Sequence, residues 1–152
     1  MLKLNKMTDY AIVCIGILSR KSNVFMTTYE ISIESGIGLA TVQKILKLLA
    51  TKSDILVTLR GSQGGYKLIK NVSRISITEV IEMIDGPISL TSCVEGGDKK
   101  CECSNSCLLK GNWNKVNEII VDTLKNISVA DLLSPENLIN FSKNKSHLQK
   151  AF

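Results

Sequence analysis

The sequence lacks long hydrophobic runs, internal repeats and long low-complexity segments. No apolar stretch approaches the roughly 20 residues of a membrane-spanning helix, so we expect no membrane span. A secretory signal is not expected either, because the apolar stretch 11–18 directly follows Thr8-Asp9-Tyr10 and no small-residue cleavage site follows it. With 44% hydrophobic residues the chain can still form a real core. We therefore expect a globular protein in the cytoplasm.

The sequence also lacks a histidine near its clustered cysteines and a C-x-x-C motif after a predicted strand. The single histidine, His147, lies in a polar tail, and no C-x-x-C follows a predicted strand, which disfavours a thiol oxidoreductase. Cysteine itself is concentrated: four of the five lie between residues 93 and 107, while Cys14 lies in an apolar helical pattern and is expected in the core. In a reducing compartment, clustered thiols more often bind metal than form disulfides.

The spacing of the four clustered cysteines favours one type of metal centre. Cys93, Cys101, Cys103 and Cys107 are separated by seven, one and three residues, whereas structural zinc sites usually take close C-x2–4-C pairs. An iron-sulfur cluster tolerates wide, irregular loops and fits best. The loop would also end at the N-terminus of a helix, where unpaired N–H groups favour an anionic centre. Zinc binding and a thiol-disulfide switch remain alternatives.

Basic residues are concentrated in the first half of the chain. Residues 1–75 hold 11 Lys and Arg against 4 Asp and Glu, while residues 76–152 hold 8 against 10. This asymmetry indicates a polyanionic partner for the first half, or simply an ordinary solvated surface.

Helix signals in this basic half favour a helix-turn-helix. We predict a first helix from Thr8-Asp9 to about Arg20, and a second that starts at a Thr27–Glu30 capping box and stops at Gly36. A third has Val42, Ile45, Leu46 and Leu49 at core spacing and a small, polar, basic outer face. Residues 56–68 then give two short β runs around glycines, a hairpin wing. The predicted class is mainly α with a small β-hairpin wing: a winged helix-turn-helix, followed by a long dimerisation helix.

The predicted DNA contacts lie on this outer face and on the wing. Lys67 and Lys70 could add phosphate contacts, which position a protein without specifying sequence. The candidate DNA-binding residues are Thr28, Leu39, Ala40, Thr41, Gln43, Lys44, Lys47, Arg60, Ser62, Gln63, Gly64 and Tyr66.

The second half should supply a loop and a long helix. A fourth helix is predicted from a Ser76–Glu79 capping box to Gly86-Pro87, and a helix of about 18 residues follows the cysteines. Its apolar stripe suggests a dimer interface, although burial against the first helix is the ordinary alternative. Ser128 could cap a short helix that ends near Leu133. The stripe contains Trp113, Val116, Ile119, Ile120, Thr123 and Leu124. The expected divisions are 1–87 for the DNA-binding domain, 88–111 for the cysteine loop, 112–133 for the dimerisation and short C-terminal helices, and 134–152 for the tail.

Several motifs together resemble one known family over residues 1 to about 133. They are Leu4 with Met7-Thr8-Asp9-Tyr10-Ala11, the wing Arg60-Gly61 with Gly64-Gly65-Tyr66, the helix that ends in Gly86-Pro87, and the cysteine loop. This set resembles the IscR, NsrR and RirA family of winged-helix transcription regulators. The tract from Cys107 to Trp113, with Ser128-Val129-Ala130-Asp131, most resembles the branch that regulates SUF iron-sulfur cluster assembly.

The resemblance implies a non-enzymatic homodimer that binds a palindromic DNA operator and holds an iron-sulfur cluster, 2Fe-2S being favoured and 4Fe-4S possible. Cys93, Cys101 and Cys107 match the three cysteine ligands of the family. The histidine that some members place three residues after the last cysteine is replaced by Lys110. Asp9, supplied by the partner subunit, is then the possible fourth ligand, and Cys103 is an alternative. The rival from another class is an iron-sulfur or thiol redox protein without a DNA role.

Overall fold

The computed structural model describes residues 4–21, 23–52, 54–61, 64–91, 94, 107–109 and 111–134. Within these ranges no helix is long and apolar enough to cross a membrane. The predicted Cys93, Cys101, Cys103, Ser62 and Gln63 lie outside the described residues. The elements in chain order are α1 (Lys6–Arg20), α2 (Thr28–Ser35), α3 (Leu39–Lys52), β1 (Leu56–Leu59), β2 (Gly65–Leu68), the 3-10 turn η1 (Val72–Arg74), α4 (Ile77–Asp85), α5 (Asn112–Lys125) and α6 (Val129–Leu133).

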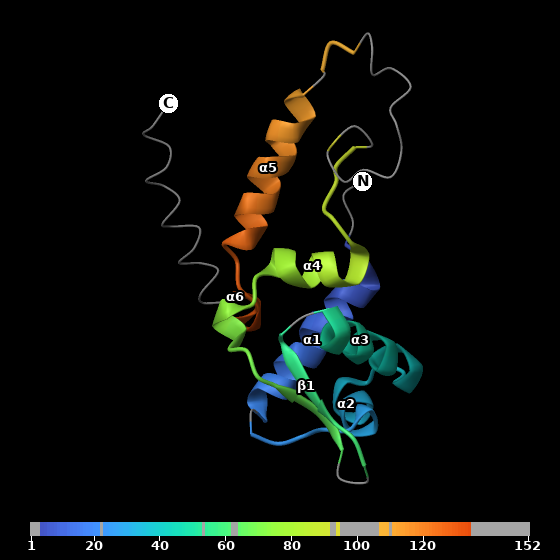
Figure 1. Ribbon diagram of the computed structural model, residues 1–152. Coiled ribbons are helices and arrows are strands. Elements are labelled where there is room, and N and C mark those ends of the chain that lie inside the picture. Colours follow the sequence, from blue (N-terminus) through green and yellow to red (C-terminus); the bar gives the residue numbers. More distant parts are fainter. Residues whose placement is uncertain are drawn as a thin grey trace.

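The first helix forms the centre of the fold, with α2, α3 and α4 packed around it (Figure 1). Its buried residues include Cys14, Ile15 and Leu18, which are at most 1% exposed. On α3, all four residues predicted to face inward, Val42 among them, are fully buried. Removing this much apolar surface from water supplies the main favourable free energy of the fold. The mainly helical class with one antiparallel hairpin is confirmed.

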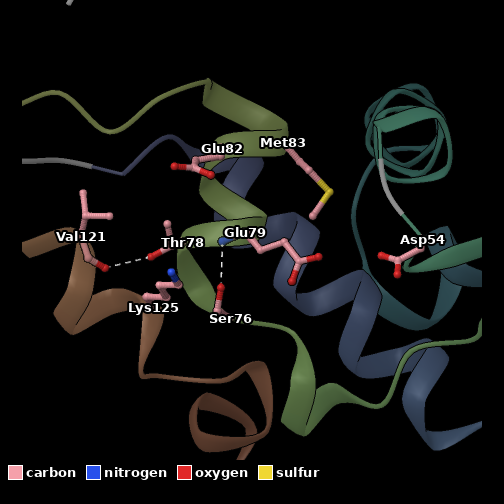
Figure 2. A pocket seen from close by; sticks show the side chains of 8 residues that line it. All are labelled: Asp54, Ser76, Thr78, Glu79, Glu82, Met83, Val121 and Lys125. Atoms are coloured by element: carbon pink, nitrogen blue, oxygen red, sulfur yellow. Dashed lines mark hydrogen bonds between the residues drawn. The ribbon is translucent and has the colours of Figure 1, made fainter. Parts of the chain in front are cut away.

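Two predicted helix starts are only partly right. The first helix begins at Lys6 with Asn5 as its N-cap, because the Asn5 side chain accepts from the Met7 N–H and the predicted cap, Thr8, is buried one turn inside. At α4, Ser76 accepts from the Glu79 N–H as predicted (Figure 2), but the Glu79 carboxylate does not reach back. It accepts from Lys70 at 2.8 Å instead. In both cases the side chain expected to cap its own helix binds a residue outside that helix: the Thr8 hydroxyl donates to Asp85, and the Glu79 carboxylate accepts from Lys70.

The wing is joined to the helical body by a β-bridge. Strands β1 and β2 pair in antiparallel register, with Leu56 opposite Leu68. On its other side Tyr66 exchanges two backbone hydrogen bonds with Met26, of 2.9 and 2.8 Å, and Met26 is a core residue. This bridge anchors the hairpin beside the N-terminus of α2.

Helix α5 projects away from the helical body, and its C-terminal end is the attached one (Figure 1). It spans 14 residues, shorter than the predicted 18 or so. The Thr78 hydroxyl of α4 donates to the Val121 carbonyl at 3.2 Å (Figure 2). After α5 the chain forms a β-bridge with the residues just before α4, between Ser76 and Ser128. Ser128 caps α6 as predicted, in a reciprocal capping box with Asp131 whose hydrogen bonds lower the pKa of that carboxyl.

Candidate nucleic-acid interface and cysteine-loop site

The outer face of α3 is exposed along its whole length. Residues 39, 40, 43, 44 and 47 are exposed and residue 41 is half-buried, so the six α3 residues proposed to contact DNA share the solvent side. This follows from the sequence, because the apolar residues of the opposite face are fully buried and fix the rotation of the helix. With Lys44 and Lys47 on it, the face is basic and free of acidic side chains.

The wing and the start of α2 enclose a second feature, a hollow of about 330 Å³. Thr28, Arg60, Gly64 and Tyr66, which the sequence pattern selected from two separate segments, all line it. Thr28 is the first residue of α2, so the start of that helix and Arg60 line the same hollow. The Thr28 hydroxyl and the Arg60 side chain suit a phosphate group, whereas the Thr27 N–H and hydroxyl already donate to the Glu30 carboxylate.

Lys67 and Lys70, the two lysines suggested as phosphate contacts, each have a partner within the protein. Lys70 lies 2.8 Å from a Glu79 carboxylate oxygen and 3.6 Å from one of Asp54, and the Glu79 hydrogen bond chiefly raises its pKa. It is held by acidic partners, so the suggestion of a phosphate contact is weakened. Lys67 lies over the Phe25 ring, 5.7 Å from its centroid, and forms no ion pair with a described acidic residue. The sequence carried no signal for either pairing.

Cys107 is the clustered cysteine that the structure describes, and it is a free, half-buried thiol. It precedes the start of α5, where the N-cap is Gly111 in the left-handed conformation, with φ 81° and no side-chain cap. Gly111 supplies no side-chain cap to α5, and the first N–H of the helix, that of Asn112, donates to the Leu109 carbonyl at 3.0 Å. Cys14 is different: burial raises its pKa to about 11, which agrees with the predicted core role.

Asp9 is exposed on the first turn of α1. That turn is fastened to the end of α4, because Asp85 accepts from the Thr8 hydroxyl at 2.7 Å and from the Asn5 amide at 3.0 Å. The first turn of α1, which carries Asp9, is thus held against the C-terminal end of α4, the helix that precedes the cysteine loop in the chain. No group of three or more His, Cys, Asp or Glu that could hold a metal occurs within the described ranges, which omit three of the four clustered cysteines. Cys107, the one proposed cysteine ligand among the described residues, is a free thiol, which is the donor type that holds an iron-sulfur centre.

The apolar stripe of α5 is divided between two environments. Trp113, Val116 and Ile119 are 37%, 41% and 66% exposed, whereas Leu124 packs against the core. Ile120 and Thr123 are half-buried, and the Thr123 hydroxyl donates to the Ile119 carbonyl. Burial against the chain's own first helix, the ordinary alternative, does not account for the exposed part.

Comparison with protein families decides the classification. The model of the family described as "Rrf2: Iron-dependent Transcriptional regulator" matches residues 4–135. The chain belongs to the Rrf2 family. The HTH-type transcriptional regulator IscR of Vibrio vulnificus is 31% identical to this Rrf2 protein over 144 residues, which cover 93% of this chain and 83% of that one. IscR of Yersinia pestis is 29% identical over 118 residues, covering 78% and 70%.

Solved structures agree on the fold of this Rrf2 protein. CymR, the global cysteine regulator of B. subtilis, superposes with a TM-score of 0.65 at 19% identity and covers 88% of this chain and 98% of its own. IscR of T. potens gives 0.62 at 20% identity, covering 89% and 88%. The predicted winged-helix architecture and the predicted family are therefore confirmed, and the chain is a DNA-binding transcriptional regulator, not an enzyme.

Proposed function

We propose that this Rrf2 protein is a homodimeric, cytoplasmic repressor that senses iron-sulfur cluster, iron, redox or nitric oxide status. Cys93, Cys101 and Cys107 would hold the cluster, with Asp9 of the partner subunit as fourth ligand and Cys103 as the alternative. The bound cluster would supply a redox-sensitive anionic centre. The observation that carries the sensor half of this proposal is the free, half-buried Cys107 thiol, which lies just before α5 in the chain. The family's description as iron-dependent supports it.

The cluster test is a spectrum of protein purified without oxygen. Wild-type protein should be coloured and contain iron and acid-labile sulfide, and Cys107→Ala should abolish the visible absorption. Cys14→Ala is the matched control, because Cys14 is a buried core thiol whose raised pKa disfavours the thiolate. A colourless wild-type protein that contains zinc, or a reversible disulfide, would favour the alternative winged-helix regulator with a zinc or thiol switch.

The DNA half would use α3 in the major groove and the wing beside it, with each subunit of a dimer on one half of a palindromic operator. Its support is the basic, acid-free outer face of α3 together with the hollow that joins Thr28 to Arg60. Strong binding to one DNA sequence at raised salt would exclude the iron-sulfur or thiol redox protein without a DNA role, because non-specific binding falls steeply with salt.

The dimer would form through the exposed part of the α5 stripe. Ile119 is 66% exposed in the single chain, so Ile119→Glu should leave the fold intact and convert the dimer to a monomer in sedimentation analysis. Val24→Glu is the control, since Val24 is also exposed, at 58%, but lies between α1 and α2. A monomeric wild-type protein, or a dimeric Ile119→Glu variant, would refute this interface.

Cluster binding or loss would then alter the loop between α4 and α5 and so change the relative placement of the two α3 helices. A dimer reads half-sites at a fixed spacing, so a small change in that placement costs affinity. Control of cluster-assembly or iron-homeostasis genes, as in the SUF-regulator branch that the sequence resembles, is the biological role that fits this switch.

A further inference from the structure

Asn117 is the one residue of α5 that is fully buried, at 7% exposure. Its carboxamide makes two hydrogen bonds to the backbone of the segment that follows α4. Oδ1 accepts from the Leu90 N–H at 3.0 Å, and Nδ2 donates to the Ile88 carbonyl at 2.9 Å. The segment from Gly86 to residue 91 leads directly into the cysteine loop, so Asn117 fastens the beginning of that loop to the helix on which the loop ends.

Both hydrogen bonds are partly shielded from water, because Asn117 is buried and Ile88 and Leu90 are half-buried. A backbone N–H or carbonyl that is shielded from water and loses its partner is left unsatisfied, so the carboxamide and the segment are expected to move together. Asn is suited to this role because one short side chain supplies a donor and an acceptor at once. An aliphatic residue of similar size would supply neither.

The other end of α5 is fixed to the DNA-binding body. Val121, one turn after Asn117, accepts from Thr78 of α4 (Figure 2). Two backbone hydrogen bonds, from Ile77 to Ile127 and from Val129 to Ile75, join the residues that follow α5 to those at and just before the start of α4. The helix is thus held firmly at its C-terminal end, while its first two turns, with Trp113 and Val116 exposed, are held through Asn117. A displacement of residues 88–90 would act on α5 through Asn117, one turn before Val121, where the helix contacts α4.

We propose that Asn117 is a positioning residue that transmits the state of the cysteine loop to α5. The inference rests on the proposed function, since it names the contact through which the cluster would act. When ligand binding draws the loop into a new position, the carboxamide carries the first turns of α5 with it. The helix tilts about its attachment to α4, and the apolar stripe moves with respect to the partner subunit.

The test compares DNA affinity of the full-length protein with and without its cluster, on an operator that the wild type selects from random DNA. Asn117→Leu should keep the visible spectrum of the cluster, because no cysteine is changed. The ratio of the two affinities should fall from its wild-type value to about one. Asn114→Leu is the matched control: Asn114 lies one turn earlier on α5, is half-buried, and makes no side-chain hydrogen bond to a described residue. It should retain the wild-type ratio.

A second readout needs no DNA. Hydrogen exchange of the α5 backbone amides should change on cluster loading in wild type and in Asn114→Leu, but not in Asn117→Leu. If Asn117→Leu does not fold, Asn117→Asp replaces it; its carboxylate still accepts from Leu90 but cannot donate to Ile88, so an intermediate ratio is expected. A wild-type ratio in these Asn117 variants, with both affinities lowered equally, means a merely structural role and overturns the inference alone. A wild-type protein whose own ratio is one overturns the proposed function as well.

Discussion

Gly65→Ala should detach the wing from the helical body. A Cβ atom on Gly65 would lie 2.4 Å from the Met26 carbonyl oxygen and 2.7 Å from its carbonyl carbon. These are backbone atoms, so the conflict cannot be relieved by rotating a side chain. The strand must move away from Met26, and the two hydrogen bonds of the Met26–Tyr66 bridge are lost.

The magnitude follows from that bridge. Two backbone hydrogen bonds, each worth roughly 0.5–1.5 kcal/mol net, give a loss of about 1–3 kcal/mol in the free energy of unfolding. For a chain of this size each kcal/mol lowers the melting temperature by roughly 2–4 °C. DNA affinity should fall as well, because the hollow that contains Arg60 and Thr28 is formed between the wing and α2.

Urea unfolding followed by circular dichroism, together with DNA binding, measures both effects. Gly38→Ala is the matched control, since a Cβ atom there meets nothing within 4 Å. Gly38 is the N-cap residue of α3, where Ala is less favourable than Gly, so this change should cost about 0.5–1 kcal/mol. If Gly65→Ala unfolds at the same urea concentration as Gly38→Ala and binds DNA as well, the close approach of β2 to residue 26 is refuted.

Three further changes test other parts of the molecule. Arg60→Ala should weaken operator binding by about 1–3 kcal/mol, and unchanged affinity in a titration would contradict a groove contact by the wing. Lys47→Ala should reduce the slope of log affinity against log salt by about one, whereas Lys21→Ala, which removes an ion pair with Glu34 at 2.9 Å, should leave that slope unchanged. Thr27→Ala removes the hydroxyl cap of α2 and should lower the stability by about 1 kcal/mol in thermal unfolding.

Features with a local cause could be predicted from the sequence. The capping box of α2, the left-handed Gly36 that ends it, and the inward face of α3 each depend on residues within one or two turns of one another. The wing was recognisable for the same reason, because glycines between two short β runs favour a tight hairpin. These elements supply the DNA-binding half of the candidate site.

Features with distant partners could not be predicted. The Thr8 hydroxyl bonds Asp85, 77 residues away, so a residue that looks like a helix cap is instead a tertiary contact. Glu79 and Lys70 likewise pair across the start of α4. Asn117 gave no signal at all, because a polar residue in an amphipathic helix is normally assigned to the solvent face.

In helix α5 the buried residue is polar and several apolar residues are exposed, the opposite of an ordinary amphipathic helix. This arrangement links the cysteine loop to the proposed dimer interface. The fully buried residue, Asn117, is polar, while Trp113, Val116 and Ile119 remain exposed on the neighbouring face. The polar residue is explained by what it binds, the segment leading into the cysteine loop. The apolar residues require a cover that the described residues of one chain do not supply, and a second copy, presenting the same stripe, would supply it. One helix would then contact both the sensor loop and the partner subunit, so a movement of the loop would reach the dimer without passing through the core of the DNA-binding domain.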